Sequence, residues 1–232
     1  MNPDNITTPD RRIIYAIPGL GTDGRIFSKL DLPYQLEILQ WPEPDPGEDL
    51  LSYTHKIASQ IPDKSPVTLL GLSFGGVIAQ EMARIRPVKK ILLISSVISP
   101  SELPFHFQTA RLLPFYRLSR GKWRIRMLPY WSPLFGIRDS GEQKLLQEIF
   151  SSFSDTYRMW AIHRLVNWRG SVHDVPIARL HGGKDKVFPP GKISGGEILK
   201  HGNHFMIYQN ADLITDWIVR EMEPNGKSGL TV

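Results

Sequence analysis

Short apolar runs alternate along the chain with longer stretches whose apolar residues recur at helical spacing. The runs have the length of strands and most end at Gly, Pro or polar residues. They lie at 12–17, 36–41, 67–72, 89–97, 177–181 and 197–200. The longer stretches, which predict helices, lie at 49–61, 74–86 and 207–222. Because the run 67–72 is almost wholly apolar, we expect it to be a central strand buried on both faces.

This alternation of strand and helix predicts one sheet architecture. Strands separated by helices are joined by right-handed crossovers, which place the helices on both faces of a parallel sheet. The expected fold is therefore a three-layer α/β/α structure with roughly six strands, most of them parallel.

The alternation is interrupted between residues 98 and 175. This segment carries 11 Lys and Arg against 6 Asp and Glu, whereas the rest of the chain holds 17 of each. It also holds 13 of the 23 aromatic residues, and helices are predicted at 142–153 and 155–168. We interpret it as a basic, aromatic helical lid inserted into a core formed by 1–97 and 176–223, with a disordered tail at 224–232.

Composition excludes several classes of protein. The 232 residues contain no cysteine, which excludes disulfides, a thiol nucleophile and thiolate metal sites. No stretch reaches the roughly 18 consecutive apolar residues of a membrane-spanning helix, and residues 1–10 lack the apolar centre of a secretory signal. We expect a cytoplasmic protein of open oligomeric state that does not insert into membranes.

A G-x-S-x-G motif, formed by Gly71, Ser73 and Gly75, stands where the strand 67–72 meets the helix 74–86. A sharp turn between strand and helix strains the backbone at the central residue and projects its side chain above the sheet. Ser73 is therefore a candidate nucleophile. The alternative is that Ser73 is only the N-cap of the helix.

Two further residues supply what a serine nucleophile needs, namely a base and an acid that orients it. Asp185 follows the strand 177–181 in a Gly-rich turn, and His204 follows the strand 197–200. Each alone is more typical of a turn or a helix cap. Together with Ser73 they occur in order at the carboxyl ends of successive strands, the edge where open parallel sheets bind ligands.

The Gly-rich loop after the first strand is the fourth candidate element. We expect the backbone N–H of Leu20, with that of Phe74, to form an oxyanion hole, and Asp23 and Arg25 to brace the loop. Gly19, Gly21 and Gly24 also match the G-x-G-x-x-G spacing of dinucleotide-binding loops. No clear ribose-binding acid follows about 20 residues later, which disfavours that alternative.

Other candidate sites are weaker. The residues His181, Asp185, His201 and His204 could suggest a metal cluster, but they lie in turns without a fixed helical spacing. The basic run 120–126 carries no recognisable nucleic-acid module and is better explained as a solvated or substrate-steering face. We expect no metal, no cofactor and no nucleic-acid partner.

These motifs resemble the α/β-hydrolase superfamily, in particular its small bacterial esterase-like members. The resemblance covers about 150 residues and rests on 18–21, 71–76, 181–185 and 202–205. It implies a cap over the nucleophile where the segment 98–175 falls. Three features depart from the family pattern: Pro18 replaces a usual His, Asn203 replaces a usual Gly before the histidine, and there is no room for two antiparallel strands before residue 11.

The sequence thus predicts a serine hydrolase that cleaves a small-molecule carboxylic ester through an acyl-serine intermediate. The alternatives are a thioesterase or C–C-bond hydrolase acting on an anionic or aromatic substrate, a non-catalytic ligand receptor on the same fold, and a dinucleotide-binding oxidoreductase. The acyl and alcohol groups of the substrate cannot be predicted from these motifs.

Overall fold

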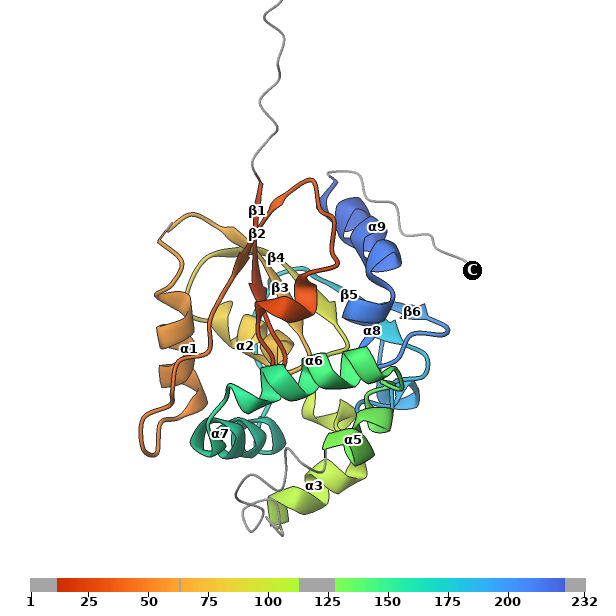
Figure 1. Cartoon of the computed structure of the whole chain (residues 1–232). Coiled ribbons are helices and arrows are strands. Elements are labelled where there is room, and N and C mark those ends of the chain that lie inside the picture. Colours follow the sequence, from red (N-terminus) through yellow and green to blue (C-terminus); the bar gives the residue numbers. More distant parts are fainter. Residues whose placement is uncertain (1–11, 63, 113–127, 224–232) are drawn as a thin grey trace, which may run out of the picture.

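The computed structural model describes residues 12–62, 64–112 and 128–223 (Figure 1). Its strands form one sheet in which every pair of neighbours is parallel, in the order β2-β1-β3-β4-β5-β6. The strands are β1 (Ile13–Ile17), β2 (Gln35–Ile38), β3 (Val67–Leu72), β4 (Val88–Ile94), β5 (Ile177–Gly182) and β6 (Glu197–Leu199). The predicted six-stranded parallel sheet is confirmed.

Helices cover both faces of the sheet and its carboxyl edge (Figure 1). The α-helices are α1 (Leu50–Ala58), α2 (Phe74–Met82), α3 (Phe105–Leu112), α5 (Leu128–Trp131), α6 (Ser140–Ser151), α7 (Asp155–Val166), α8 (Met206–Gln209) and α9 (Ala211–Met222). Short 3-10 helices are η1 (Gly24–Phe27), η2 (Pro100–Glu102), η4 (Ser132–Leu134) and η5 (Pro190–Lys192).

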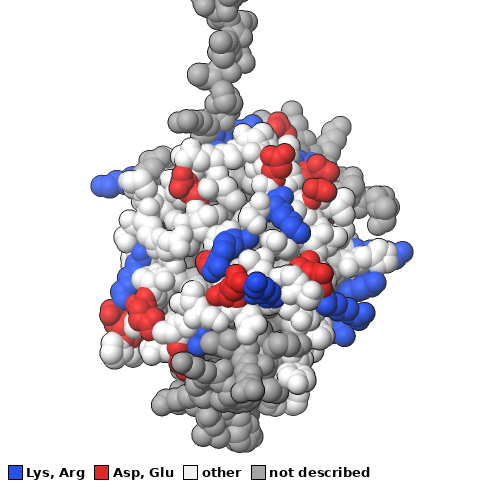
Figure 2. Space-filling view, viewed as in Figure 1, with Lys and Arg blue, Asp and Glu red and all other residues white. Residues whose placement is uncertain are grey.

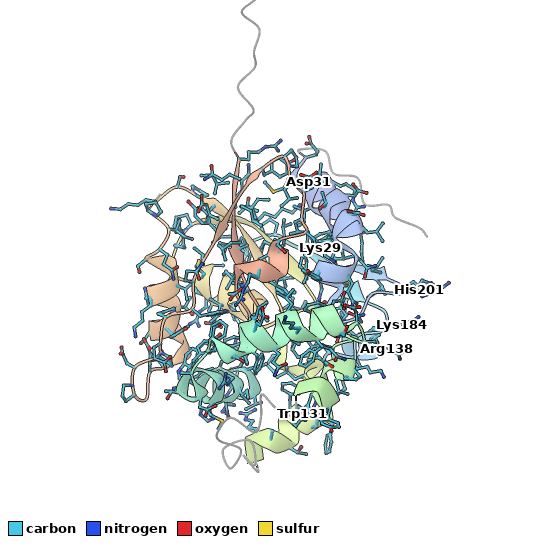
Figure 3. The ribbon with its side chains drawn as sticks, viewed as in Figure 1. Lys29, Asp31, Trp131, Arg138, Lys184 and His201 are labelled. Atoms are coloured by element: carbon cyan, nitrogen blue, oxygen red, sulfur yellow. The ribbon has the colours of Figure 1, made fainter. Side chains whose placement is uncertain are left out.

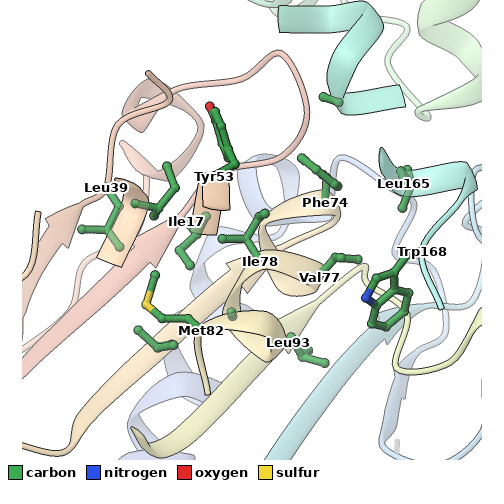
Figure 4. Close-up of a cluster of buried hydrophobic side chains, with 14 of the residues drawn as sticks. Ile17, Leu39, Tyr53, Phe74, Val77, Ile78, Met82, Leu93, Leu165 and Trp168 are labelled. Atoms are coloured by element: carbon green, nitrogen blue, oxygen red, sulfur yellow. The ribbon is translucent and has the colours of Figure 1, made fainter. Parts of the chain in front are cut away.

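Two apolar cores lie on opposite faces of the sheet because successive side chains of a strand point to opposite sides. On one face, Leu69 and Leu93 pack with buried side chains of α1, α2 and α7 (Figure 4). On the other face, Leu70 and Leu92 pack with η1, α6, α8 and α9, where Trp217 is fully buried. This arrangement is the predicted three-layer α/β/α architecture.

The strand order reverses between β1 and β3. From β1 the chain adds β2 on one side and then crosses to place β3 on the other. The register aligns Ile17 with Gly71 and Leu72 with Ile94, so the loops after these strands leave the sheet at one level. In open α/β sheets the crevice at such a reversal is the usual ligand site.

Several predicted boundaries are wrong. The helix predicted over 207–222 is two helices, because the backbone at Asn210 (φ −121°, ψ 38°) leaves the helical range between α8 and α9. The strand predicted to reach residue 97 ends at Ile94, where Ser95 takes a positive φ of 48°. The strand predicted over 36–41 runs from Gln35 to Ile38.

The segment 98–175 contains α3, α5, α6 and α7, and Figure 1 shows these helices gathered beyond the carboxyl ends of the strands. α7 packs on the rest of the chain, since Trp160 donates from its indole N–H to the carbonyl of Glu48 at 2.7 Å. The predicted tail 224–232 and the basic run 120–126 lie outside the described residues. In the described ranges, no helix is both long and apolar enough to cross a membrane.

Candidate active site

Ser73 occupies the strained turn that the motif predicts. Its φ of 51° and ψ of −118° are unusual for a residue other than glycine, and the side chain makes no capping hydrogen bond to α2. The interpretation of Ser73 as only an N-cap is therefore wrong. The turn is held by the N–H of Ser73, which donates to the Ile94 carbonyl (3.0 Å), and by the Ser96 hydroxyl, which donates to the Ser73 carbonyl (2.7 Å).

The glycines around Ser73 are required by close backbone contacts. A Cβ atom on Gly71 would lie 2.4 Å from the Cα of Gly76, and one on Gly75 would lie 2.2 Å from the Ile17 carbonyl oxygen. The elbow thus packs directly against the end of β1. This packing explains why small residues flank the serine in the sequence.

The three residues predicted as nucleophile, base and acid lie together in one chain of contacts. Ser73 Oγ is 3.0 Å from His204 Nε2, and His204 Nδ1 is 2.7 Å from Asp185 Oδ2. A carboxylate at Nδ1 fixes the proton on that nitrogen and leaves Nε2 as an acceptor facing the serine. Ser73 is partly exposed, whereas the Asp185 side chain is fully buried.

Asp185 is held as a charged acceptor. Its Oδ1 accepts from the N–H groups of Val187 (2.8 Å) and Phe188 (2.9 Å). Burial raises the pKa of Asp185, but the contacts with His204 and with these N–H groups outweigh burial and bring the pKa below its ordinary value. The carboxylate is therefore ionised and able to stabilise an imidazolium.

The sequence suggested His181 only as a member of a weak metal cluster, whereas the structure places it beside Asp185 as a support for the acid loop. His181 Nε2 lies 2.8 Å from the Phe188 carbonyl and 3.4 Å from Asp185 Oδ2, and the side chain is fully buried. Burial lowers the pKa of His181, so it is a neutral support for the acid loop. The Gly-rich motif HGGKD, at 181–185, was the sequence signal that could have predicted this supporting role of His181.

The loops that carry Asp185 and His204 pack through glycines. A Cβ on Gly182 would lie 2.6 Å from the carbonyl oxygen of Gly202. Asn203, the departure from the family pattern, anchors the histidine loop, because its Oδ1 accepts from the N–H of Phe205 at 2.7 Å.

The imidazole of His204 lies between two aromatic rings. The ring centroids of Phe135 and Phe188 are 5.8 and 5.4 Å from that of the imidazole. Phe135 belongs to the segment 98–175, so this segment contributes directly to the surroundings of the histidine.

The loop predicted to supply an oxyanion donor abuts the serine. Gly19 to Thr22 forms a tight turn in which both the N–H and the hydroxyl of Thr22 donate to the Gly19 carbonyl (3.0 and 2.9 Å). A Cβ on Gly19 would lie 3.5 Å from that of Ser73. Among the described residues, the N–H groups of Leu20 and Phe74 donate to no other protein group, so both remain available.

The structure supports neither the dinucleotide-binding loop nor the metal cluster that the sequence left open. The first glycine loop leads into η1, a four-residue 3-10 helix, rather than the long helix on which a dinucleotide pyrophosphate rests. In the part of the chain that is described, no three His, Asp or Glu side chains are grouped to hold a metal ion. Asp23 and Arg25 do brace the loop, with the Arg25 guanidinium donating to the Asp23 carboxylate at 2.7 Å.

Comparison of the fold with solved structures finds esterases and other hydrolases, and also bromoperoxidases. An esterase from Exiguobacterium antarcticum has a TM-score of 0.72 at 17% identity, over 90% of this chain and 91% of its own. A thermophilic esterase from Thermogutta terrifontis has a TM-score of 0.69 at 16% identity, over 90% of each chain. An epoxide hydrolase from Bacillus megaterium has a TM-score of 0.68 at 10% identity, over 90% and 92%. At these identities the likeness concerns the fold alone.

A search of curated protein sequences finds no significant match. The model of the alpha/beta hydrolase family matches residues 7–217, which is most of the chain and includes the elbow, the acid loop and the histidine loop. The chain therefore belongs to the alpha/beta hydrolase family.

Proposed function

We propose that this protein is a carboxylic ester hydrolase that acts on a small-molecule ester through an acyl-serine intermediate. The observation that carries the proposal is the contact chain from Ser73 Oγ through His204 to Asp185, with distances of 3.0 and 2.7 Å. Both distances are short enough for hydrogen bonds, and serine catalysis requires proton transfers along such hydrogen bonds.

In the first step, Ser73 Oγ attacks the carbonyl carbon of the ester and its proton passes to His204 Nε2. The imidazolium keeps its Nδ1 proton on Asp185, whose buried charge stabilises it. The carbonyl π electrons move to the oxygen, which becomes an oxyanion. In this proposal the N–H groups of Leu20 and Phe74 stabilise that charge, and losing one such donor typically costs ~10²–10³ in rate.

In the second step, the tetrahedral intermediate collapses and the bond to the alcohol oxygen breaks. His204 Nε2 gives its proton to the departing alcohol, which leaves an acyl ester on Ser73. Water then attacks the carbonyl carbon of this ester while His204 Nε2 accepts a proton from it. The bond between this carbon and Ser73 Oγ breaks, His204 returns the proton to Oγ, and the acid is released. The reaction needs only water as co-substrate.

Aromatic side chains of the segment 98–175 lie next to the candidate site, which supports the proposal. Phe135 lies beside His204, and a Cβ on Gly21 would lie 2.7 Å from the Phe150 ring. Aromatic side chains over the site would exclude water from the oxyanion and strengthen its hydrogen bonds. We propose that this segment is the cap of the site.

The test is ester hydrolysis by matched serine variants, using 4-nitrophenyl esters graded by acyl length. Ser73→Ala is expected to lower kcat by about 10⁶. Ser95→Ala is the matched control, because Ser95 also has a positive φ at the end of a neighbouring strand but its hydroxyl has no hydrogen-bond partner among the described residues. Equal loss in both variants, or retained activity in Ser73→Ala, would refute the proposal.

A second candidate, hydrolysis of an anionic ester or thioester, is favoured by a group of exposed basic residues. Arg138, Lys184 and His201 lie near one another at one edge of the molecule, on loops next to the acid and the histidine (Figure 3). Figure 2 shows Lys and Arg side chains gathered there. Among described residues, none of the three forms an ion pair. A preference for acyl-CoA over neutral esters, lost at high salt, would support this candidate.

A further inference from the structure

An aromatic cluster lies on the α1 and α7 side of Ser73. It consists of Trp41, Tyr53, Phe74, Tyr157 and Trp160. The Trp41 ring has its centroid 5.7 Å from that of Phe74 and 5.7 Å from that of Tyr157, and the Tyr53 and Trp160 rings are 4.0 Å apart. Residues from three separate parts of the chain therefore meet beside the nucleophile.

Two of the polar atoms in this cluster are paired and two are not. The Tyr53 hydroxyl donates to the Pro42 carbonyl at 2.6 Å, and the Trp160 indole N–H to the Glu48 carbonyl. The Tyr157 hydroxyl and the Trp41 indole N–H are buried and have no hydrogen-bond partner among the described residues. Because unpaired buried polar groups are unfavourable and rare in native proteins, these two call for an explanation.

The unpaired groups stand next to both proposed oxyanion residues. The backbone N–H of Gly21, the residue after Leu20, is near enough to the Tyr157 hydroxyl to favour its ionised form, so it lowers the pKa of Tyr157 in opposition to burial. Trp41 stacks on Phe74, the residue after Ser73. Tyr157 is only 1% exposed, so the hydroxyl faces the interior beside the oxyanion loop rather than solvent.

The chemistry of these groups restricts what they could bind. Burial raises the pKa of Tyr157 far above its ordinary value, so the phenol stays neutral and keeps its proton. The Trp41 N–H is also a neutral donor. The carboxylate of Glu43 acts on Tyr157 and raises the pKa further, so the local field disfavours an anion. An uncharged acceptor oxygen fits best.

We propose that Tyr157, with Trp41 beside it, determines specificity by donating a hydrogen bond to a second, uncharged oxygen of the substrate. This oxygen would be a keto, ether or hydroxyl oxygen close to the carbonyl that Ser73 attacks. The inference rests on the proposed ester hydrolase function and names its substrate class, an oxygen-substituted ester. A site built around buried donors rejects analogues that lack the acceptor, because the donors are then left unpaired.

The experiment compares esters of equal length that differ by one oxygen. The acyl pairs are 4-nitrophenyl butanoate with methoxyacetate, and pentanoate with 3-methoxypropanoate. The alcohol pair is butyl with 2-methoxyethyl butanoate. The wild type should have a higher kcat/KM for the oxygen-containing member of at least one pair. Tyr157→Phe should reduce that preference by about tenfold. A tenfold change corresponds to the loss of one hydrogen bond whose strength is near the upper end of the usual range.

Tyr53→Phe is the matched control, since its hydroxyl lies in the same cluster but is paired with Pro42. It should keep the oxygen preference and lower Tm by about 2–4 °C, because it loses an internal hydrogen bond. Tyr157→Phe should lower Tm by less than Tyr53→Phe does, because the hydroxyl that it removes donates to no described protein group.

Three results would overturn the inference: no oxygen preference in the wild type, an unchanged preference in Tyr157→Phe, or a loss of folding in Tyr157→Phe that shows a structural role. These results are distinct from failure of the proposed function, which would appear as an active Ser73→Ala protein whatever the selectivity of Tyr157→Phe.

Discussion

Replacing Glu102 with glutamine should expose the contribution of a buried ion pair to the stability of this fold. Glu102 and Arg179 are 1% and 5% exposed, and the guanidinium donates to both carboxylate oxygens. The carboxylate also accepts from the N–H groups of Ile98 (2.8 Å) and Ser194 (3.0 Å). The pair thus joins the start of the segment 98–175 to β5.

The size of this contribution to stability follows from the shift in the pKa of the Glu102 carboxyl group. Burial raises the pKa of Glu102, but the hydrogen bonds from Arg179, Ser194 and Ile98 outweigh burial and lower the pKa from 4.5 to about 2. That difference corresponds to about 3 kcal/mol of stability. Because the pKa is lower in the folded state, this stabilisation is complete above about pH 4.5 and is lost as pH falls towards 2.

Glu102→Gln should therefore lower the free energy of unfolding by about 3–5 kcal/mol at pH 7, since it leaves the Arg179 charge buried without its counter-ion. Urea unfolding followed by circular dichroism measures this change. The difference in free energy of unfolding between wild type and variant should narrow between pH 4.5 and 3, because in this range Glu102 of the unfolded wild type binds a proton and Glu102 of the folded wild type does not. Asp45→Asn, which breaks an exposed pair with Lys56, is the control and should lower the free energy of unfolding far less than Glu102→Gln does. A loss below 1 kcal/mol at pH 7, or a difference that stays constant down to pH 3, would refute this reasoning.

Two further predictions concern the site and the elbow that carries Ser73. Asp185→Asn should lower kcat by about 10⁴ with little change in KM, because the amide favours the wrong tautomer of His204; a loss below tenfold in steady-state kinetics would contradict this. Gly75→Ala should destabilise the fold by about 3 kcal/mol in urea unfolding, because its Cβ would lie 2.2 Å from the Ile17 carbonyl oxygen, and wild-type stability would show that the elbow can relax.

The features that could be predicted from the sequence are those that local residue patterns determine. Strand positions followed from apolar runs, and the elbow followed from a serine between glycines at a strand end. The boundary errors arose where tertiary structure decides. Asn210 breaks a continuous helical pattern, and Ser95 ends β4 in a conformation that its residue type does not favour.

In the candidate site too, some residues could be predicted from local sequence patterns and others depend on tertiary contacts. Asp185 and His204 could be predicted because each follows a strand directly, in a loop rich in small residues. The contributions of Ser96 and Tyr157 could not, because they depend on contacts between residues far apart in sequence. The Ser96 hydroxyl, after β4, donates to the Ser73 carbonyl, after the neighbouring β3. Tyr157 on α7 lies near Gly21 in the loop that follows β1. No local pattern distinguishes these side chains from ordinary core residues.

Covalent labelling tests the central claim, that Ser73 is the activated nucleophile, most directly. The wild-type protein is incubated with a fluorophosphonate, digested and analysed by peptide mass spectrometry, alongside Ser73→Ala and Ser95→Ala. The account predicts one adduct per chain on the peptide containing Ser73, retained in Ser95→Ala and absent from Ser73→Ala. An adduct on another residue, or no adduct on folded wild-type protein, would contradict it.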